Sequence, residues 1–153
     1  MTWGERLRAP VFVALGLATR AMTLGVKAFA TDGGRVMLVR HTYVSGWHLP
    51  GGGVERRETV WQAVDKELRE ETSLRLVGRP ELWGFYKNER TSRFDHIAMF
   101  VVREFEDLGA FTPTREIAEA RWFAFDALPP DATEATRARV AEVRENRHPA
   151  DRW

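Results

Sequence analysis

Three glutamates in one short segment could together bind a metal ion. Glu67, Glu70 and Glu71 are spaced i, i+3, i+4, so a helix would stack their carboxylates on one side. Like charges at this spacing repel one another unless a cation lies among them. Because carboxylate oxygens suit a hard divalent cation, the segment predicts a site for Mg²⁺, with Mn²⁺ as the alternative ion.

A helix from about Thr59 to Thr72 would carry these acids. Thr59 and Gln62 have the spacing of a capping box. At about 100° per residue, Glu71 falls about 40° from Glu67, inside the apolar stripe of the helix. That stripe consists of Val60, Trp61, Val64 and Leu68. An ordinary solvated helix would keep its acids on the polar face, and unpaired carboxylates facing a core cost roughly several kcal/mol each. The pattern therefore favours a bound cation.

A glycine-rich run at residues 49–53 lies just upstream of this helix. Backbone without side chains can approach the acids closely. A metal ion beside closely packed backbone is suited to phosphate chemistry.

The segment resembles the signature of the Nudix hydrolases, Gly-x5-Glu-x7-Arg-Glu-apolar-x-Glu-Glu-x-Gly-apolar. The matching positions are Gly52, Glu58, Glu67, Leu68, Glu70, Glu71 and Leu74. With similar flanking segments, the resemblance extends over roughly residues 22–130. It implies an α/β (α+β) fold, a three-layer α/β/α sandwich with a mixed central sheet. It also implies metal-dependent hydrolysis of a diphosphate bond in a nucleoside diphosphate derivative or a similar small diphosphate compound.

The same resemblance implies roles for residues around the acids. Gly51 would give a backbone carbonyl to the metal beside the glutamates. Glu58 would either touch the metal through water or shape the loop. A glutamate, Glu67 or Glu116, would take the proton from the attacking water, and Glu119 is the alternative to Glu116.

Two positions depart from the family pattern. Lys66 replaces an arginine that would orient Glu67, so it keeps the charge and loses the bidentate geometry. Ser73 replaces a glycine that ends the helix, and a left-handed conformation there would strain serine by roughly 1 kcal/mol. These departures motivate a different class of function, a ligand-binding or regulatory module with little turnover. The intact set of acids argues against it.

Three arginines could bind substrate phosphates. Arg40, Arg90 and Arg93 each carry the planar group that matches phosphate oxygens. Each could equally be an ordinary surface residue. The loops near them, rather than the acidic segment, would choose the leaving group.

The chain as a whole has the composition of a single soluble domain. It has 153 residues, 44% of them hydrophobic and 29% charged. The net charge of +1 gives no general attraction to nucleic acid or membranes, so trimming of RNA 5′ ends has little support. Without cysteine, thiol nucleophiles are excluded. The expected partner is a small diphosphate.

The N-terminal segment raises the question of targeting. An apolar run at residues 11–18 follows Arg6 and Arg8, as in a signal peptide, but Pro10 and Arg20 bound it closely. It is too short to span a bilayer. We therefore expect residues 1–20 to be an extension packed on a single domain, 21–153, in the cytoplasm. The apolar run could also mediate a homodimer.

The remaining pattern predicts strands before and after the acidic helix. Residues 23–31 and 35–40 are separated by Asp32-Gly33-Gly34 and predict a hairpin. Residues 96–105 are apolar on both faces, which predicts a central strand. Further strands are expected at 74–77, 82–86 and 121–125, and a last helix at about 131–147.

Overall fold

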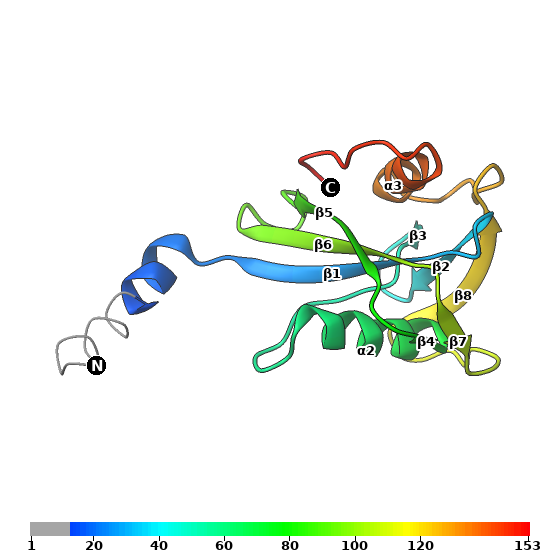
Figure 1. Ribbon diagram of the computed structural model, residues 1–153, viewed down its shortest axis with the longest axis horizontal. Coiled ribbons are helices and arrows are strands. Elements are labelled where there is room, and N and C mark those ends of the chain that lie inside the picture. The colour runs from blue at the N-terminus through cyan, green and yellow to red at the C-terminus, as the bar shows by residue number, and fades with distance from the viewer. Residues whose placement is uncertain (1–12) are drawn as a thin grey trace.

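The computed structural model describes residues 13–153, which form three layers (Figure 1). Strands make up the middle layer, α2 (Val60–Thr72) covers one face, and α3 (Glu134–Arg144) lies over the other. This arrangement confirms the predicted α+β sandwich. The last helix is shorter at both ends than the sequence pattern predicted.

Eight strands build the middle layer as two three-stranded sheets and a two-stranded ribbon. The first sheet has the order β1-β6-β5, the second β3-β2-β8, and the ribbon pairs β4 with β7. The strands are β1 (Thr23–Ala30), β2 (Arg35–His41), β3 (Trp47–His48), β4 (Leu74–Leu76), β5 (Glu81–Lys87), β6 (Asp95–Val102), β7 (Phe105–Asp107) and β8 (Ile117–Ala124). Because β6 runs parallel to β1 and antiparallel to β5, the first sheet is mixed, as predicted.

Strand β6 has the central place that its apolar pattern predicted. Ala98 and Phe100 pack in the core that includes α2, whereas Met99 and Val101 pack in the core that includes α3. The alternation along one strand therefore joins the two helical layers.

The predicted hairpin between β1 and β2 is wrong. The two strands meet only at the bridge between Thr31 and Val36, and each then pairs in a different sheet. The physical reason is that both edges of β1 are already taken. One edge pairs with β6, and the other bonds to the loop at residues 50–54.

Helix α2 begins and ends as its sequence predicted. The Thr59 side chain accepts from the amide of Gln62, and the Gln62 side chain accepts from the amide of Thr59, which completes the capping box. At the other end, Ser73 has φ +61° and its amide donates to the carbonyl of Arg69. Serine thus takes the left-handed position of the family's glycine.

Residues 13–20 form a helix that projects beyond the start of β1 (Figure 1). Its apolar side chains Val13, Leu15 and Leu17 are exposed, so the expected packing on the domain finds no support in this helix. The first residues of the expected extension, including Arg6 and Arg8, lie outside the described residues. No helix within residues 13–153 has the length and apolar character needed to cross a membrane.

Candidate active site

The glycine-rich loop lies along β1 like an additional strand. The amides of Val26 and Ala28 donate to the carbonyls of Gly52 and Pro50, each over 2.9 Å. These bonds hold the loop against the edge of β1 that no other strand occupies. The loop therefore has a fixed position relative to the sheet.

Gly51 is the point of closest approach between this loop and β1. A Cβ here would lie 2.0 Å from the carbonyl oxygen of Val26, and the backbone has φ +147°. Only glycine satisfies both conditions. The Gly51 amide donates to Glu71 Oε2 over 2.8 Å, so the loop is also fastened to α2.

Glu71 is the buried member of the three acids. Glu71 is 7% exposed, as its place in the apolar stripe predicted. Burial raises the pKa of its carboxyl from 4.5 to about 7, although the Lys27 ammonium and the Gly51 amide act in the opposite direction. A carboxylate held in this way is costly unless positive charge lies beside it.

Glu67 and Glu70 are progressively less buried than Glu71. Glu67 is partly buried and lies against Gly52, where an added Cβ would come within 2.7 Å of the Glu67 carboxylate carbon. Burial raises the pKa of Glu67, and the Lys66 charge opposes this rise. Glu70 is exposed, so the expectation that all three acids face inward is wrong for this residue.

The three acids share one cavity with Glu116. This cavity has a volume of about 400 Å³, and its lining residues are Glu67, Glu70, Glu71, Thr114, Arg115, Glu116 and Ile117. The segment carrying Glu116 is bonded to the β2–β3 loop, since the amide of Thr42 donates to the Glu116 carbonyl over 2.8 Å. Glu116 is thus 45 or more positions along the chain from the three acids of α2, and the fold brings all four carboxylates to one cavity.

Glu119, the alternative to Glu116, lies elsewhere. It is on β8 and forms ion pairs with Arg40 and Arg121. It does not line the cavity of the four acids. The structure therefore favours Glu116 as the residue that joins the acids of α2.

The residues of this cavity fit a hard cation by their chemistry. They supply carboxylate oxygens from side chains that range from buried Glu71 to exposed Glu70 and Glu116, and the Gly51 carbonyl lies next to the amide that holds Glu71. Within residues 13–153, however, no three acidic or histidine side chains already converge as a completed metal site would. The carboxylates must therefore turn toward a common point to bind an ion.

Glu58 and Lys66 form a structural pair at the start of α2. The Glu58 carboxylate accepts from the amide of Glu55 over 2.7 Å and from Lys66 Nζ over 3.2 Å. The bond from the Glu55 amide, with help from Lys66, lowers the pKa of Glu58. These contacts favour loop shaping over water-mediated metal binding for Glu58.

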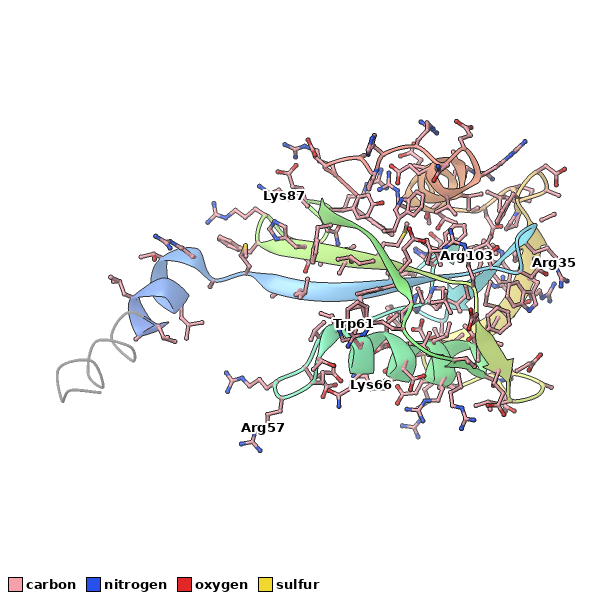
Figure 2. All side chains as sticks on the ribbon, viewed as in Figure 1. Arg35, Arg57, Trp61, Lys66, Lys87 and Arg103 are labelled. Atoms are coloured by element: carbon pink, nitrogen blue, oxygen red, sulfur yellow. The ribbon has the colours of Figure 1, made fainter. Side chains whose placement is uncertain are left out.

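Lys66 contacts the catalytic candidate Glu67 less closely than it contacts Glu58. Its Nζ lies 3.6 Å from Glu67 Oε1. Although partial burial opposes the effect, hydrogen bonds to Glu58 and Glu55 raise the pKa of Lys66. Figure 2 labels Lys66 on α2 and Arg57 on the loop that precedes the helix.

Lys27 is the important residue that sequence reasoning missed. It lies on β1, and its Nζ donates to the carbonyls of Leu49 and Gly51 over 2.9 and 3.3 Å. Burial lowers its pKa, while the negative charges of Glu71 and Glu67 act against this shift. The available signal was a lone lysine inside the apolar run of a predicted strand.

Two neighbouring ring residues of the β2–β3 region are affected by charges of this site, His41 by Lys27 and Tyr43 by the acids. Burial, together with the nearby Lys27 charge, lowers the pKa of His41 to about 4, so this ring is neutral at physiological pH. Its Nδ1 is buried and has no hydrogen-bond partner among the described residues. Burial and the charge of Glu116 raise the pKa of Tyr43, whose ring centroid lies 5.2 Å from that of His41.

The three candidate phosphate-binding arginines do not converge. Arg40 pairs with Glu119, and Arg93 lies over the ring of Phe94 at 4.7 Å. Arg90 pairs with Glu134 over 2.7 Å and also lines a second cavity. Of the three, only Arg90 lines a cavity that also contains Lys27.

The second cavity has a volume of about 350 Å³ and adjoins the glycine-rich loop. Its polar lining side chains are Lys27, His48, Asn88, Arg90, Thr91, Thr133 and Thr136, and Trp153 provides an aromatic wall. No carboxylate lines it. Lys27 therefore lines the cationic cavity, while its charge acts on Glu71 and Glu67 of the acidic one.

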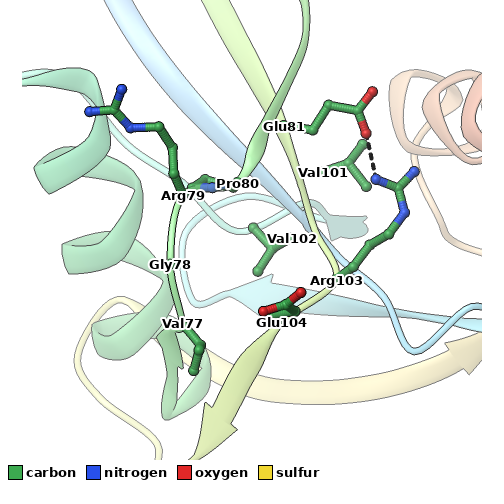
Figure 3. Close-up of a pocket in the computed structure, with 9 residues that line it drawn as sticks. All are labelled: Val77, Gly78, Arg79, Pro80, Glu81, Val101, Val102, Arg103 and Glu104. Atoms are coloured by element: carbon green, nitrogen blue, oxygen red, sulfur yellow. Dashed lines mark hydrogen bonds and ion pairs between the residues drawn. The ribbon is translucent and has the colours of Figure 1, made fainter.

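A third cavity of about 380 Å³ lies between the β4–β5 connection and the end of β6 (Figure 3). An ion pair between Arg103 and Glu81 crosses it. It shares no lining residue with the acidic cavity, and it plays no part in the arrangement described above.

Comparison with known proteins identifies the family of this arrangement. A family model described as NUDIX domain matches residues 21–143. A MutT-like protein of Streptomyces ambofaciens is 34% identical over 113 residues, which cover 74% of this chain and 67% of that protein.

Two further comparisons agree with this match. An RNA pyrophosphohydrolase of Halorhodospira halophila is 38% identical over 66 residues, which cover 40% of this chain and 36% of that protein. The crystal structure of a MutT NUDIX hydrolase from Burkholderia pseudomallei aligns with a TM-score of 0.68 at 26% identity, covering 79% of this chain and 97% of that chain.

Proposed function

From the premise that this chain belongs to the Nudix hydrolase family, we propose that it is a pyrophosphohydrolase, which cleaves a diphosphate bond in a nucleoside diphosphate derivative or similar small diphosphate in a metal-dependent reaction. The observation that carries the proposal is the cavity in which Glu116 joins the three acids of α2. The donor set suits magnesium, with manganese as a substitute.

The proposed ligands are the oxygens of Glu67, Glu70 and Glu71 and the carbonyl of Gly51. When bound, the ion would neutralise charge on the diphosphate and make a bound water more acidic. Glu71 is already oriented by the Gly51 amide, and Glu67 is confined between Gly52 and Lys66. This confinement limits the reorientation that each side chain needs.

A carboxylate must also take the proton of the attacking water. Two residues could do so, Glu67 on α2 and Glu116 across the cavity. Glu116 is exposed at this cavity, whereas Glu67 is partly buried and has a raised pKa. Both carboxylates line the cavity, so the proposal keeps both as candidates for the base. Lys66 would then position Glu67 through its charge.

The proposal is tested with Glu70→Gln. Glu70 is exposed, so its replacement should leave the fold intact, as checked by circular dichroism and thermal unfolding. With Mg²⁺ and a panel of diphosphate compounds, we expect at least about a hundredfold loss of turnover. The products are resolved by chromatography. Full activity of the variant would refute the metal site proposed here.

The same panel separates the alternative functions. Nucleotide binding without hydrolysis in magnesium would favour a ligand-binding or regulatory module. RNA with a 5′-triphosphate belongs in the panel because one relative, matched over 66 residues, is named an RNA pyrophosphohydrolase. A steep salt dependence of RNA binding would support that substrate. A cytoplasmic location and a homodimer formed through the N-terminal run stay predictions.

A further inference from the structure

Lys27 Nζ bonds to the carbonyls of the glycine-rich loop that do not accept from the β1 backbone. The carbonyls of Pro50 and Gly52 accept from β1 amides, so the alternate carbonyls of Leu49 and Gly51 point the other way. Both of these accept from Lys27 Nζ, over 2.9 and 3.3 Å. The Lys27 ammonium is therefore bonded to the Gly51 carbonyl, the same carbonyl that the proposed function assigns as a metal ligand.

The charges around Lys27 explain why a cation is held there. Glu71 and Glu67 are the carboxylates whose charge acts on its ammonium. Lys66, the other lysine near these acids, lies 3.6 Å from Glu67 and also bonds to Glu58 and Glu55, so Lys27 is the lysine whose charge acts on the buried Glu71. Buried carboxylates need a cation close by, and Lys27 is placed to supply it in the metal-free protein.

The Lys27 side chain also borders the cavity of the α3 layer. Its neighbours Val26 and Ala28 pack in the α2 core, and Phe29 packs in the α3 core, so alternation directs Lys27 toward the α3 layer. There it lines the cavity of about 350 Å³ with Arg90 and no carboxylate. A flexible four-carbon stem allows the ammonium to move between the loop carbonyl and this cavity.

We propose that Lys27 is an exchangeable cation, which holds the Gly51 carbonyl in the metal-free protein and moves to a phosphate of the substrate when a divalent ion takes that carbonyl. The inference rests on the proposed function, since it requires an ion at Gly51. It assigns Lys27 as a positioning residue that links metal binding to substrate binding. Its predicted ligand is the anionic part of the diphosphate that enters the cavity shared with Arg90.

The first test measures Mn²⁺ binding to the metal-free protein by electron paramagnetic resonance, without substrate. Lys27→Gln removes the competing charge and keeps an amide donor for the loop carbonyls. We expect it to bind Mn²⁺ at least about tenfold more tightly than the unaltered chain. Arg115→Gln is the matched control, because Arg115 is an exposed cation at the acidic cavity with no bond to Gly51. It should tighten binding by less than about threefold, since exposed charges are screened.

The second test follows Lys27 itself in the unaltered chain. With lysine side chains labelled with ¹³C, the signal of the Lys27 ε-carbon should shift as Mg²⁺ saturates the protein. It should shift again when methylenediphosphonate, a diphosphate that cannot be hydrolysed, is added. In the presence of Mn²⁺, Lys27→Gln should bind this compound at least about tenfold more weakly. This readout does not depend on turnover.

The outcomes separate the two proposals. If the unaltered chain binds no Mn²⁺, the proposed function fails. If it binds Mn²⁺ and hydrolyses diphosphates, but Lys27→Gln binds Mn²⁺ no more tightly than Arg115→Gln does, only the exchange is refuted. A Lys27 signal that stays unchanged on Mg²⁺ saturation would refute the exchange as well, whether or not the variant folds.

Discussion

The Glu71 carboxylate should reduce the stability of the metal-free protein as the pH rises. Glu71 is 7% exposed, and burial raises its pKa from 4.5 to about 7. At about 1.4 kcal/mol per pKa unit, this rise corresponds to about 3 kcal/mol. The folded protein holds the proton more tightly than the unfolded chain. The cost is therefore absent below about pH 4.5, grows up to about pH 7 and is complete above it.

Glu71→Gln should remove most of this cost. The glutamine oxygen can still accept from the Gly51 amide, which now donates to Glu71 over 2.8 Å, and glutamine does not ionise. Loss of the Glu71 charge leaves Lys27 with less compensation, so we expect about 2 kcal/mol rather than 3. Relative to the unaltered chain, the variant should thus gain about 2 kcal/mol between pH 5 and pH 8.

The assay is urea unfolding with EDTA at these two pH values. Glu70→Gln is the control, since it removes a carboxylate from an exposed position one residue away. Its effect on the free energy of unfolding should be small and similar at both pH values. If Glu71→Gln changes stability equally at the two pH values, the reasoning about burial is refuted. Added Mg²⁺ should stabilise the unaltered chain more than the Glu71→Gln variant.

Two further predictions concern backbone positions. Gly52→Ala would place its Cβ 2.7 Å from the Glu67 carboxylate, which is the end of a flexible side chain. We expect turnover to fall at least about tenfold while the urea midpoint changes little. Unchanged turnover would contradict this role for Glu67. Ser73→Gly should stabilise the protein by up to about 1 kcal/mol in urea unfolding, because Ser73 has φ +61°, and a destabilised variant would show that this position is not strained.

The acidic helix could be predicted because its determinants are local. The capping box of Thr59 and Gln62 lies within four consecutive residues, and helical periodicity alone placed Glu71 among apolar side chains. Periodicity did not place Glu70 correctly. Its exposure depends on how far the segment carrying Glu116 covers α2, and that segment is distant in the sequence.

The pairing of β1 could not be predicted from local signals. Asp32-Gly33-Gly34 does form a turn, in which Asp32 Oδ1 accepts from the amides of Gly34 and Arg35. A turn alone does not decide which strands pair. The glycine-rich loop competes for the same edge of β1, and Gly51 lets it come closer than a strand with side chains could.

Lys27 escaped prediction for a related reason. Its run of neighbours has strong strand character, and a lysine in such a run usually marks a solvated face. Only the position of the loop carbonyls shows that its ammonium has partners. The Lys27 charge on β1 is thus accommodated by the carbonyls of a loop more than 20 positions away and by the charge of acids on α2.

In the proposal made above, substrate choice would follow from the same long-range assembly. The cavity lined by Lys27 combines side chains from β1, from the segment after β5, from the start of α3 and from Trp153. No one of these segments has a motif that identifies a ligand. Together they place two cations, several hydroxyls and an indole around about 350 Å³ with no acid. Such a lining favours an anionic group over a neutral or cationic one. A substrate that carries phosphate into this cavity would gain charged contacts with Lys27 and Arg90, which a neutral group there would lack.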